Sequence, residues 1–114
     1  MSTLDYLEKL LSFGTTSAHS NSELITWLQS ELLAFGAIVK IIPNEDGSKA
    51  NLFATFGPQS CGGVMLSGHT DVVPVTGQDW TVPAFSMTRK DGKVFGRGTA
   101  DMKGFIASMM TAAK

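Results

Sequence analysis

The sequence is poor in several features that mark whole classes of protein. Its single cysteine, Cys61, cannot form a disulfide within the chain, so a reducing compartment is the simpler expectation. Nine Lys and Arg face ten Asp and Glu with no basic stripe, which argues against nucleic-acid binding. There is no uninterrupted apolar run of about 18 residues and no basic N-terminal stretch. We therefore expect a cytoplasmic protein with neither a membrane span nor a signal peptide.

The 114 residues nevertheless contain enough apolar sequence for a folded domain. The hydrophobic fraction is 43% and only 17% of the residues are charged, which excludes a disordered chain. No heptad pattern runs through the sequence, which excludes a coiled coil. The length fits one small domain or a part of a larger one.

Two amphipathic helices are predicted at the start of the chain. Residues 4–11 carry an apolar stripe at helical spacing, and residues 2–5 resemble a capping box that would begin this helix. Residues 24–35 form a second stripe, which Gly36 ends. The S-x-x-E pattern at residues 20–23 predicts a capping box for this second helix as well.

Two β-hairpins are predicted further along the chain. Residues 37–42 and 51–56 read as strands joined by a turn that contains Asp-Gly. Residues 85–89 and 93–95 form a similar pair that turns at Asp91-Gly92.

The remaining apolar segments suggest a larger buried structure. Residues 64–66 are short and continuously apolar, which predicts a strand buried on both faces. Residues 103–113 predict a helix that is apolar nearly all round and therefore belongs inside a domain. We expect an α/β fold, a mixed β-sheet flanked by helices, of which this chain is a truncated part. A C-terminal helix docked on its own sheet is the alternative.

A histidine and an aspartate follow the predicted buried strand. His69-Thr70-Asp71 would lie at a strand end, where ligands usually bind in α/β sheets. In extended backbone Asp71 points the same way as His69. Its carboxylate could therefore accept the second ring N–H of a metal-bound imidazole. The alternative is a capped strand end, in which Asp71 bonds nearby backbone amides.

Asp101 is the second candidate metal ligand. It follows two glycines in the segment G-R-G-T-A-D and sits between a predicted strand and a predicted helix. There it could reach the same sheet edge as His69. A carboxylate has two oxygens and can hold two divalent ions about 3.5–4 Å apart. The alternative is a helix N-cap, a common role for aspartate at this place.

Taken together, the ordered segments G-H-T-D-V-V-P, Trp80 and G-R-G-T-A-D-M-K-G-F resemble the zinc-dependent aminoacylase and carboxypeptidase family. The resemblance begins around Leu4 and covers nearly the whole chain. It implies a zinc-exopeptidase-like catalytic domain, of which residues 1–114 would be the N-terminal part. The rest of that domain and a lid domain would be absent.

The family resemblance also implies roles for individual residues. His69 would bind one zinc ion, Asp71 would be the catalytic residue that orients His69, and Asp101 would bridge two zinc ions. Cobalt is an alternative metal, and no organic cofactor is expected, because Gly96-x-Gly98 lacks the third glycine of a dinucleotide site. A cis peptide bond is implied between Asp101 and Met102.

The implied activity is hydrolysis of a small N-acyl amino acid. The details of the two segments favour N-acetyl-L-ornithine, cleaved to ornithine and acetate in arginine biosynthesis. An N-succinyl substrate, a peptide, or a non-catalytic binding module are the alternatives. The family places its general-base Glu downstream of the bridging Asp, whereas all four Glu here precede His69. We therefore expect this chain to be inactive alone. A homodimer through the missing lid is also implied.

Overall fold

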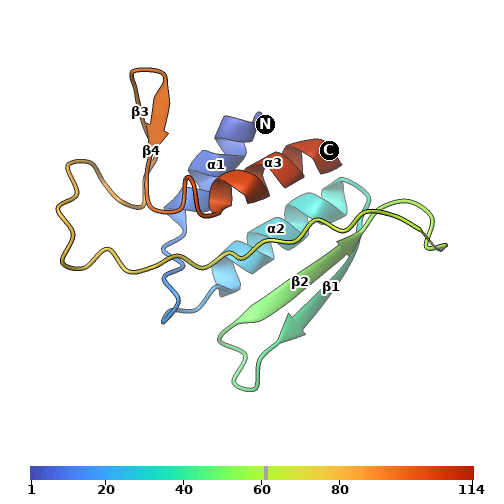
Figure 1. The fold of residues 1–114 in the computed structure, drawn as a ribbon. Helices are drawn as coiled ribbons and strands as arrows, with labels where there is room; N and C mark the ends of the chain where they lie inside the picture. The colour runs from blue at the N-terminus through green and yellow to red at the C-terminus, as the bar shows by residue number, and fades with distance from the viewer. Residues whose placement is uncertain (61) are drawn as a thin grey trace.

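Three helices and two β-hairpins make up the part of the chain described by the computed structural model, residues 1–60 and 62–114 (Figure 1). Cys61, the expected free cysteine, lies outside these residues. The elements follow the order α1 (Thr3–Ser12), α2 (Ser22–Ala34), β1 (Ile38–Pro43), β2 (Ala50–Thr55), β3 (Thr88–Lys90), β4 (Lys93–Phe95) and α3 (Lys103–Ala113). No helix in the described part is both long enough and apolar enough to cross a membrane.

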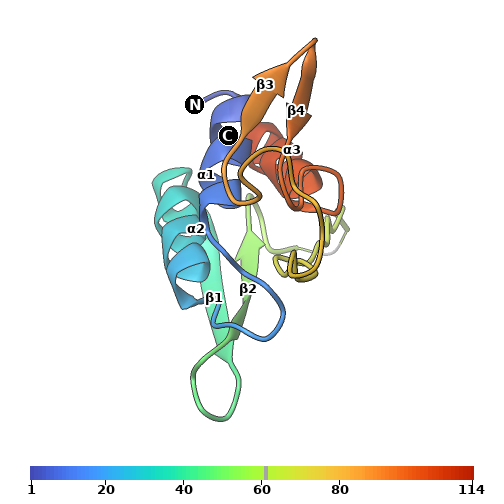
Figure 2. The same ribbon diagram turned by 90° about the vertical axis from the view of Figure 1, so that its left-hand side faces the viewer.

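Helix α1 begins at the capping box that the sequence predicts. The Ser2 hydroxyl accepts a hydrogen bond from Asp5 N at 3.3 Å, and the Asp5 carboxylate accepts one from Ser2 N at 2.7 Å. Two of the free N–H groups at the helix start are thereby satisfied. The apolar stripe of α1 packs against α3, and the two helices lie side by side in both views (Figures 1 and 2).

Helix α2 is present, but the capping box expected at residues 20–23 is wrong. The N-cap is Asn21, which makes no side-chain capping bond. Its amide is used elsewhere, because Nδ2 donates to Ala50 O and Oδ1 accepts from Ala50 N, both at 3.0 Å. Ser20 instead accepts from Ser22 N at 3.1 Å. The two hydrogen bonds between Asn21 and Ala50 tie the start of α2 to β2.

Both predicted hairpins form, with small differences in their bounds. Strands β1 and β2 pair antiparallel from Ile38 opposite Thr55 to Pro43 opposite Ala50, and the hairpin packs on α2. Strands β3 and β4 also pair antiparallel and turn at residues 91–92, both at positive φ. Such a turn matches the twist of its strands. Strand β3 is shorter than predicted, since residues 85–87 lie outside it.

The strand predicted at residues 64–66 is wrong. Val64, Met65 and Leu66 form no strand and are 89%, 75% and 55% exposed. Within the described residues nothing pairs with this segment, so the strands form two separate hairpins rather than one mixed sheet. The combination of helices and strands is that of the expected α/β class.

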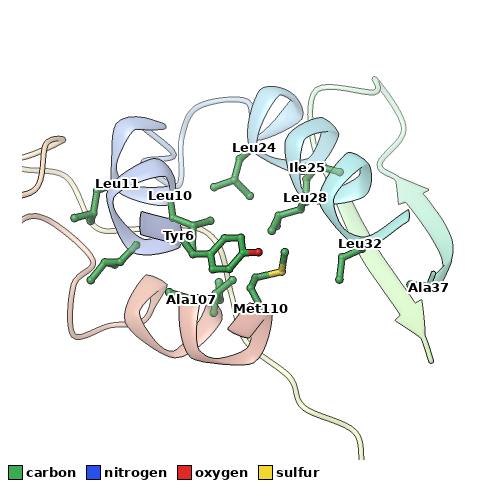
Figure 3. Close-up of a cluster of buried hydrophobic side chains, with 12 residues drawn as sticks. Tyr6, Leu10, Leu11, Leu24, Ile25, Leu28, Leu32, Ala37, Ala107 and Met110 are labelled. Carbon is green, nitrogen blue, oxygen red and sulfur yellow. The ribbon is translucent and has the colours of Figure 1, made fainter. Parts of the chain in front are cut away.

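A single apolar core joins the three helices to the first hairpin (Figure 3). Tyr6 lies at its centre, with its ring 6.3 Å from that of Trp27 and 6.4 Å from that of Phe35. Burial on this scale stabilises the fold by about 25 cal/mol for each Å² of apolar surface removed from water. The core includes Leu7, Leu10, Leu11, Leu24, Ile25, Leu28, Leu32, Ala37, Ile106, Ala107 and Met110.

Replacing Ser2 by alanine is expected to lower the free energy of unfolding by about 1 kcal/mol, because one half of the capping box is lost. Urea unfolding monitored by circular dichroism measures this change. Glu8→Ala is the control, since Glu8 is exposed on the same helix. Equal stability of the Ser2 variant and the wild type would contradict the capping role.

Candidate metal centre

The His69–Asp71 segment is held against the loop that follows α1. Val72 N donates to Thr15 O at 3.0 Å, and Ser17 N donates to Val72 O at 3.1 Å, as in a short parallel bridge. The buried Thr15 hydroxyl donates to Thr70 O at 2.7 Å. Three hydrogen bonds thus fix the backbone on both sides of Asp71.

The Asp101 segment is held by the start of α3. Lys103 N donates to Gly98 O at 2.8 Å, and its fully buried side chain donates from Nζ to Phe13 O at 2.7 Å. Burial lowers the pKa of Lys103 to about 8. Charged side chains are solvated at the surface by default, and Lys103 departs from that default. Lys103 instead anchors the loop that carries Asp101 to the end of α1.

Met102 joins the two segments. Its sulfur accepts a hydrogen bond from His69 N at 3.2 Å, and a Cβ on Gly68 would lie 3.1 Å from Met102 Cε. A glycine before the histidine therefore leaves room for close approach, as the sequence suggests. The peptide bond between Asp101 and Met102 is cis.

The structure brings His69, Asp71 and Asp101 together. His69 Nε2 lies 3.0 Å from Asp101 Oδ1. On the other side of the ring, Nδ1 lies 3.0 Å from the backbone oxygen of Asp71 and 3.1 Å from its carboxylate Oδ1. Both ring nitrogens therefore face oxygen acceptors, and both would donate in the protonated imidazolium. A metal ion that replaced the Nε2 proton would meet the Nε2 lone pair on the Asp101 side and would leave Nδ1–H donating to Asp71.

Neighbouring groups shift the pKa values of His69 and Asp71. Burial alone would lower the pKa of His69, but hydrogen bonds to the Asp71 backbone oxygen and the Asp101 carboxylate outweigh it and raise that pKa. The pKa of Asp71 is lowered, chiefly by a hydrogen bond from the Ser17 hydroxyl. Asp71 is therefore ionised at neutral pH and available as an acceptor.

His69 and Asp101 lie on a pocket of about 220 Å³, which residues 71–73 and 96–100 complete. The Asp101 side chain is 85% exposed, so its second oxygen is open to solvent. Two zinc ligands at ~2.0–2.2 Å in tetrahedral geometry lie about 3.3 Å apart, close to the separation of His69 Nε2 and Asp101 Oδ1. The donor types and their spacing therefore fit one side of a zinc site.

The pair is not a complete metal site. No group of three or more His, Cys, Asp or Glu side chains is arranged to hold a metal ion in residues 1–60 and 62–114. Asp71 faces Nδ1, the side of the ring away from Asp101. His19, the other histidine of the chain, lies in the loop before α2 and is exposed.

An arginine beside this pocket forms a second polar cluster. The Arg97 guanidinium lies 5.1 Å from the centre of the Trp80 ring. Gln78 accepts hydrogen bonds from both side chains, at 3.0 Å from Trp80 Nε1. Arg97 Nε is buried and has no partner in the described part of the chain. Arg97 is thus half-buried and lines the pocket, whereas charged side chains are solvated at the surface by default.

Sequence reasoning missed the residues that support the site from a distance. Ser17 and Thr15 lie more than fifty residues before their partners in the 70–72 segment. Local spacing therefore carries no signal for them. For Lys103 the signal is its place in the first turn of a helix that is otherwise apolar nearly all round.

The site segments are similar in sequence to a known family. Residues 65–114 match the model of peptidase family M20/M25/M40. The acetylornithine deacetylase of Pasteurella multocida (strain Pm70) is 46% identical over 94 residues, 82% of this chain and 24% of that protein. That of Proteus mirabilis (strain HI4320) is 45% identical over 96 residues, 83% of this chain and 24% of that protein. The chain spans about a quarter of the length of these curated relatives.

The fold has a counterpart among solved structures. The crystal structure of human carnosine dipeptidase 1 matches 97% of this chain and 27% of its own, with a TM-score of 0.79 and 24% identity. This likeness shows a shared fold. Both segments that meet at the candidate site lie within residues 65–114, the part of the chain that is similar to peptidase family M20/M25/M40.

Proposed function

We propose that the chain is part of a metal-dependent amide hydrolase that removes the acetyl group of N-acetyl-L-ornithine. The observation that carries the proposal is the 46% identity to a relative named acetylornithine deacetylase, over 82% of this chain. The meeting of His69 with Asp101, from segments 32 residues apart, supports a hydrolytic metal centre at the same place. We assign residues 1–114 to the N-terminal part of its catalytic domain.

His69 and Asp101 are the residues that would hold the metal. His69 offers Nε2, and Asp101 offers one oxygen towards His69 and a second towards solvent. Asp71 fixes the ring and the tautomer of His69 by accepting from Nδ1. When bound, zinc lowers the pKa of a water ligand and polarises the acyl carbonyl. A bridging role for Asp101 agrees with two metal ions, zinc or cobalt, in the complete protein.

The general base and the remaining ligands lie outside this chain in our proposal. All four Glu of the sequence precede His69. At the site, two side chains could bind a metal directly, those of His69 and Asp101. A zinc centre that catalyses hydrolysis uses three protein ligands and an open position. The two donors present therefore call for further ligands from elsewhere in the protein. A cytoplasmic location agrees with the lone cysteine.

The test is a substrate panel with the full-length protein that carries this chain. N-acetyl-L-ornithine is expected to be hydrolysed in preference to N-succinyl-diaminopimelate and to a dipeptide, and chelation of the metal should remove the activity. The isolated 114-residue polypeptide should show no turnover. Preference for the succinyl substrate or the dipeptide would transfer the proposal to another activity of the family. Zinc-independent ligand binding without hydrolysis would favour a binding module.

A further inference from the structure

A serine from the loop between α1 and α2 contacts the aspartate that orients His69. The Ser17 hydroxyl donates a hydrogen bond to Asp71 Oδ2. The other oxygen, Asp71 Oδ1, lies 3.1 Å from His69 Nδ1. The two carboxylate oxygens are thus divided between two partners. A carboxylate held at one oxygen has less freedom to turn the other away from the imidazole.

Ser17 is itself held from two directions. Its backbone N–H donates to Val72 O at 3.1 Å, and its backbone oxygen accepts a hydrogen bond from Lys49 Nζ. Lys49 lies immediately before β2, so the first hairpin and the 69–72 segment both fix the serine. Ser17 is exposed, but these two backbone contacts hold its hydroxyl in position to donate to Asp71.

The Asp71 side chain needs such a contact because it is 51% exposed. Water can compete for each of its oxygens, and an exposed carboxylate is free to rotate unless a donor holds it. We propose that Ser17 is a positioning residue of the metal centre, which fixes the Asp71 carboxylate and through it the metal-binding nitrogen of His69. This inference rests on the proposed function, since it assigns Ser17 a role at the same site.

Three variants of the full-length protein test the role. Ser17→Ala removes the hydroxyl, Ser17→Thr keeps it, and Ser20→Ala removes an exposed serine hydroxyl of the same loop that bonds Ser22 and not the site. Zinc alone is the probe, and its dissociation constant is measured by competition with a chromophoric chelator. Thermal unfolding of the metal-free proteins reports the structural cost of each change.

The dissociation constant of Ser17→Ala is expected to rise about tenfold, the lower end of the effect of losing an outer partner of a metal ligand. Ser17→Thr should stay near the wild type. Ser20→Ala should leave the dissociation constant unchanged. An unchanged constant in Ser17→Ala, or an equal rise in Ser20→Ala, would overturn the positioning role. In the second case the loop would act only as structural support.

His69→Ala separates the inference from the function on which it rests. If this variant binds zinc as tightly as the wild type, the proposed metal centre fails, whatever Ser17 does. If His69→Ala loses zinc affinity and Ser17→Ala does not, the metal centre stands and the role of Ser17 alone is refuted.

Discussion

Alanine in place of His69 or Asp101 is expected to lower kcat/KM of the full-length protein by more than about 100-fold. Loss of an outer partner of a metal ligand costs 10- to 100-fold in affinity or activity, and loss of a direct ligand should exceed that range. His69 Nε2 and Asp101 Oδ1 face each other at a distance of 3.0 Å. Each single variant should therefore also bind less zinc, as measured by metal analysis after dialysis.

His19→Ala and Asp79→Ala are the matched controls for these two variants. Each removes an exposed side chain of the same type from a loop of the same chain. Both should keep the activity and the metal content of the wild type. Wild-type metal content in His69→Ala or Asp101→Ala would refute the assignment of these residues.

A graded series follows from the two contacts that lead away from His69. Asp71 touches His69 and Ser17 touches Asp71, so each is one contact further from the metal. We therefore order the losses as His69, then Asp71, then Ser17. A graded order of losses would indicate that each residue positions the next. Equal losses in the three variants would indicate that the loop only supports the structure.

The parts of the fold that the sequence predicts are those determined by neighbouring residues. The capping box of α1, the turn at Asp91-Gly92 and the bounds of α3 each follow from residues within a few positions of one another. Local hydrogen bonding and backbone preferences are sufficient for these features. The two polar segments are also recognisable locally, and the structure brings them together at 3.0 Å.

The errors arise where a distant partner decides the outcome. Asn21 replaces Ser20 as the N-cap of α2 because its amide bonds Ala50, 29 residues away. Lys103 is buried because Phe13 O, 90 residues away, accepts from its ammonium group. Residues 64–66 are apolar enough for a buried strand, but an apolar pattern gives no information about whether a neighbouring strand is available. Non-local contacts of this kind leave no signal in spacing.

Alanine at Gly104 should destabilise the protein, although two local effects have opposite signs here. In an ordinary helix Gly→Ala stabilises by about 0.8–1.0 kcal/mol. At this position the added Cβ would lie 2.2 Å from the backbone oxygen of Thr99. A backbone atom cannot move aside as a side-chain end does, so we expect overpacking to prevail and to cost about 3 kcal/mol or more. Chemical unfolding of the variant measures the net effect.

The Gly104→Ala substitution also tests the candidate site, because the clash is with the backbone oxygen of Thr99. Thr99 lies two residues before Asp101, so relief of the clash shifts the segment that carries the proposed bridging carboxylate. Zinc affinity should therefore fall together with stability. Gly14→Ala is the control, because an added Cβ there meets nothing within 4 Å. A Gly104→Ala protein that is more stable than the wild type would mean that helix propensity outweighs the contact with Thr99. Lower stability with unchanged zinc affinity would separate the packing of α3 from the position of Asp101.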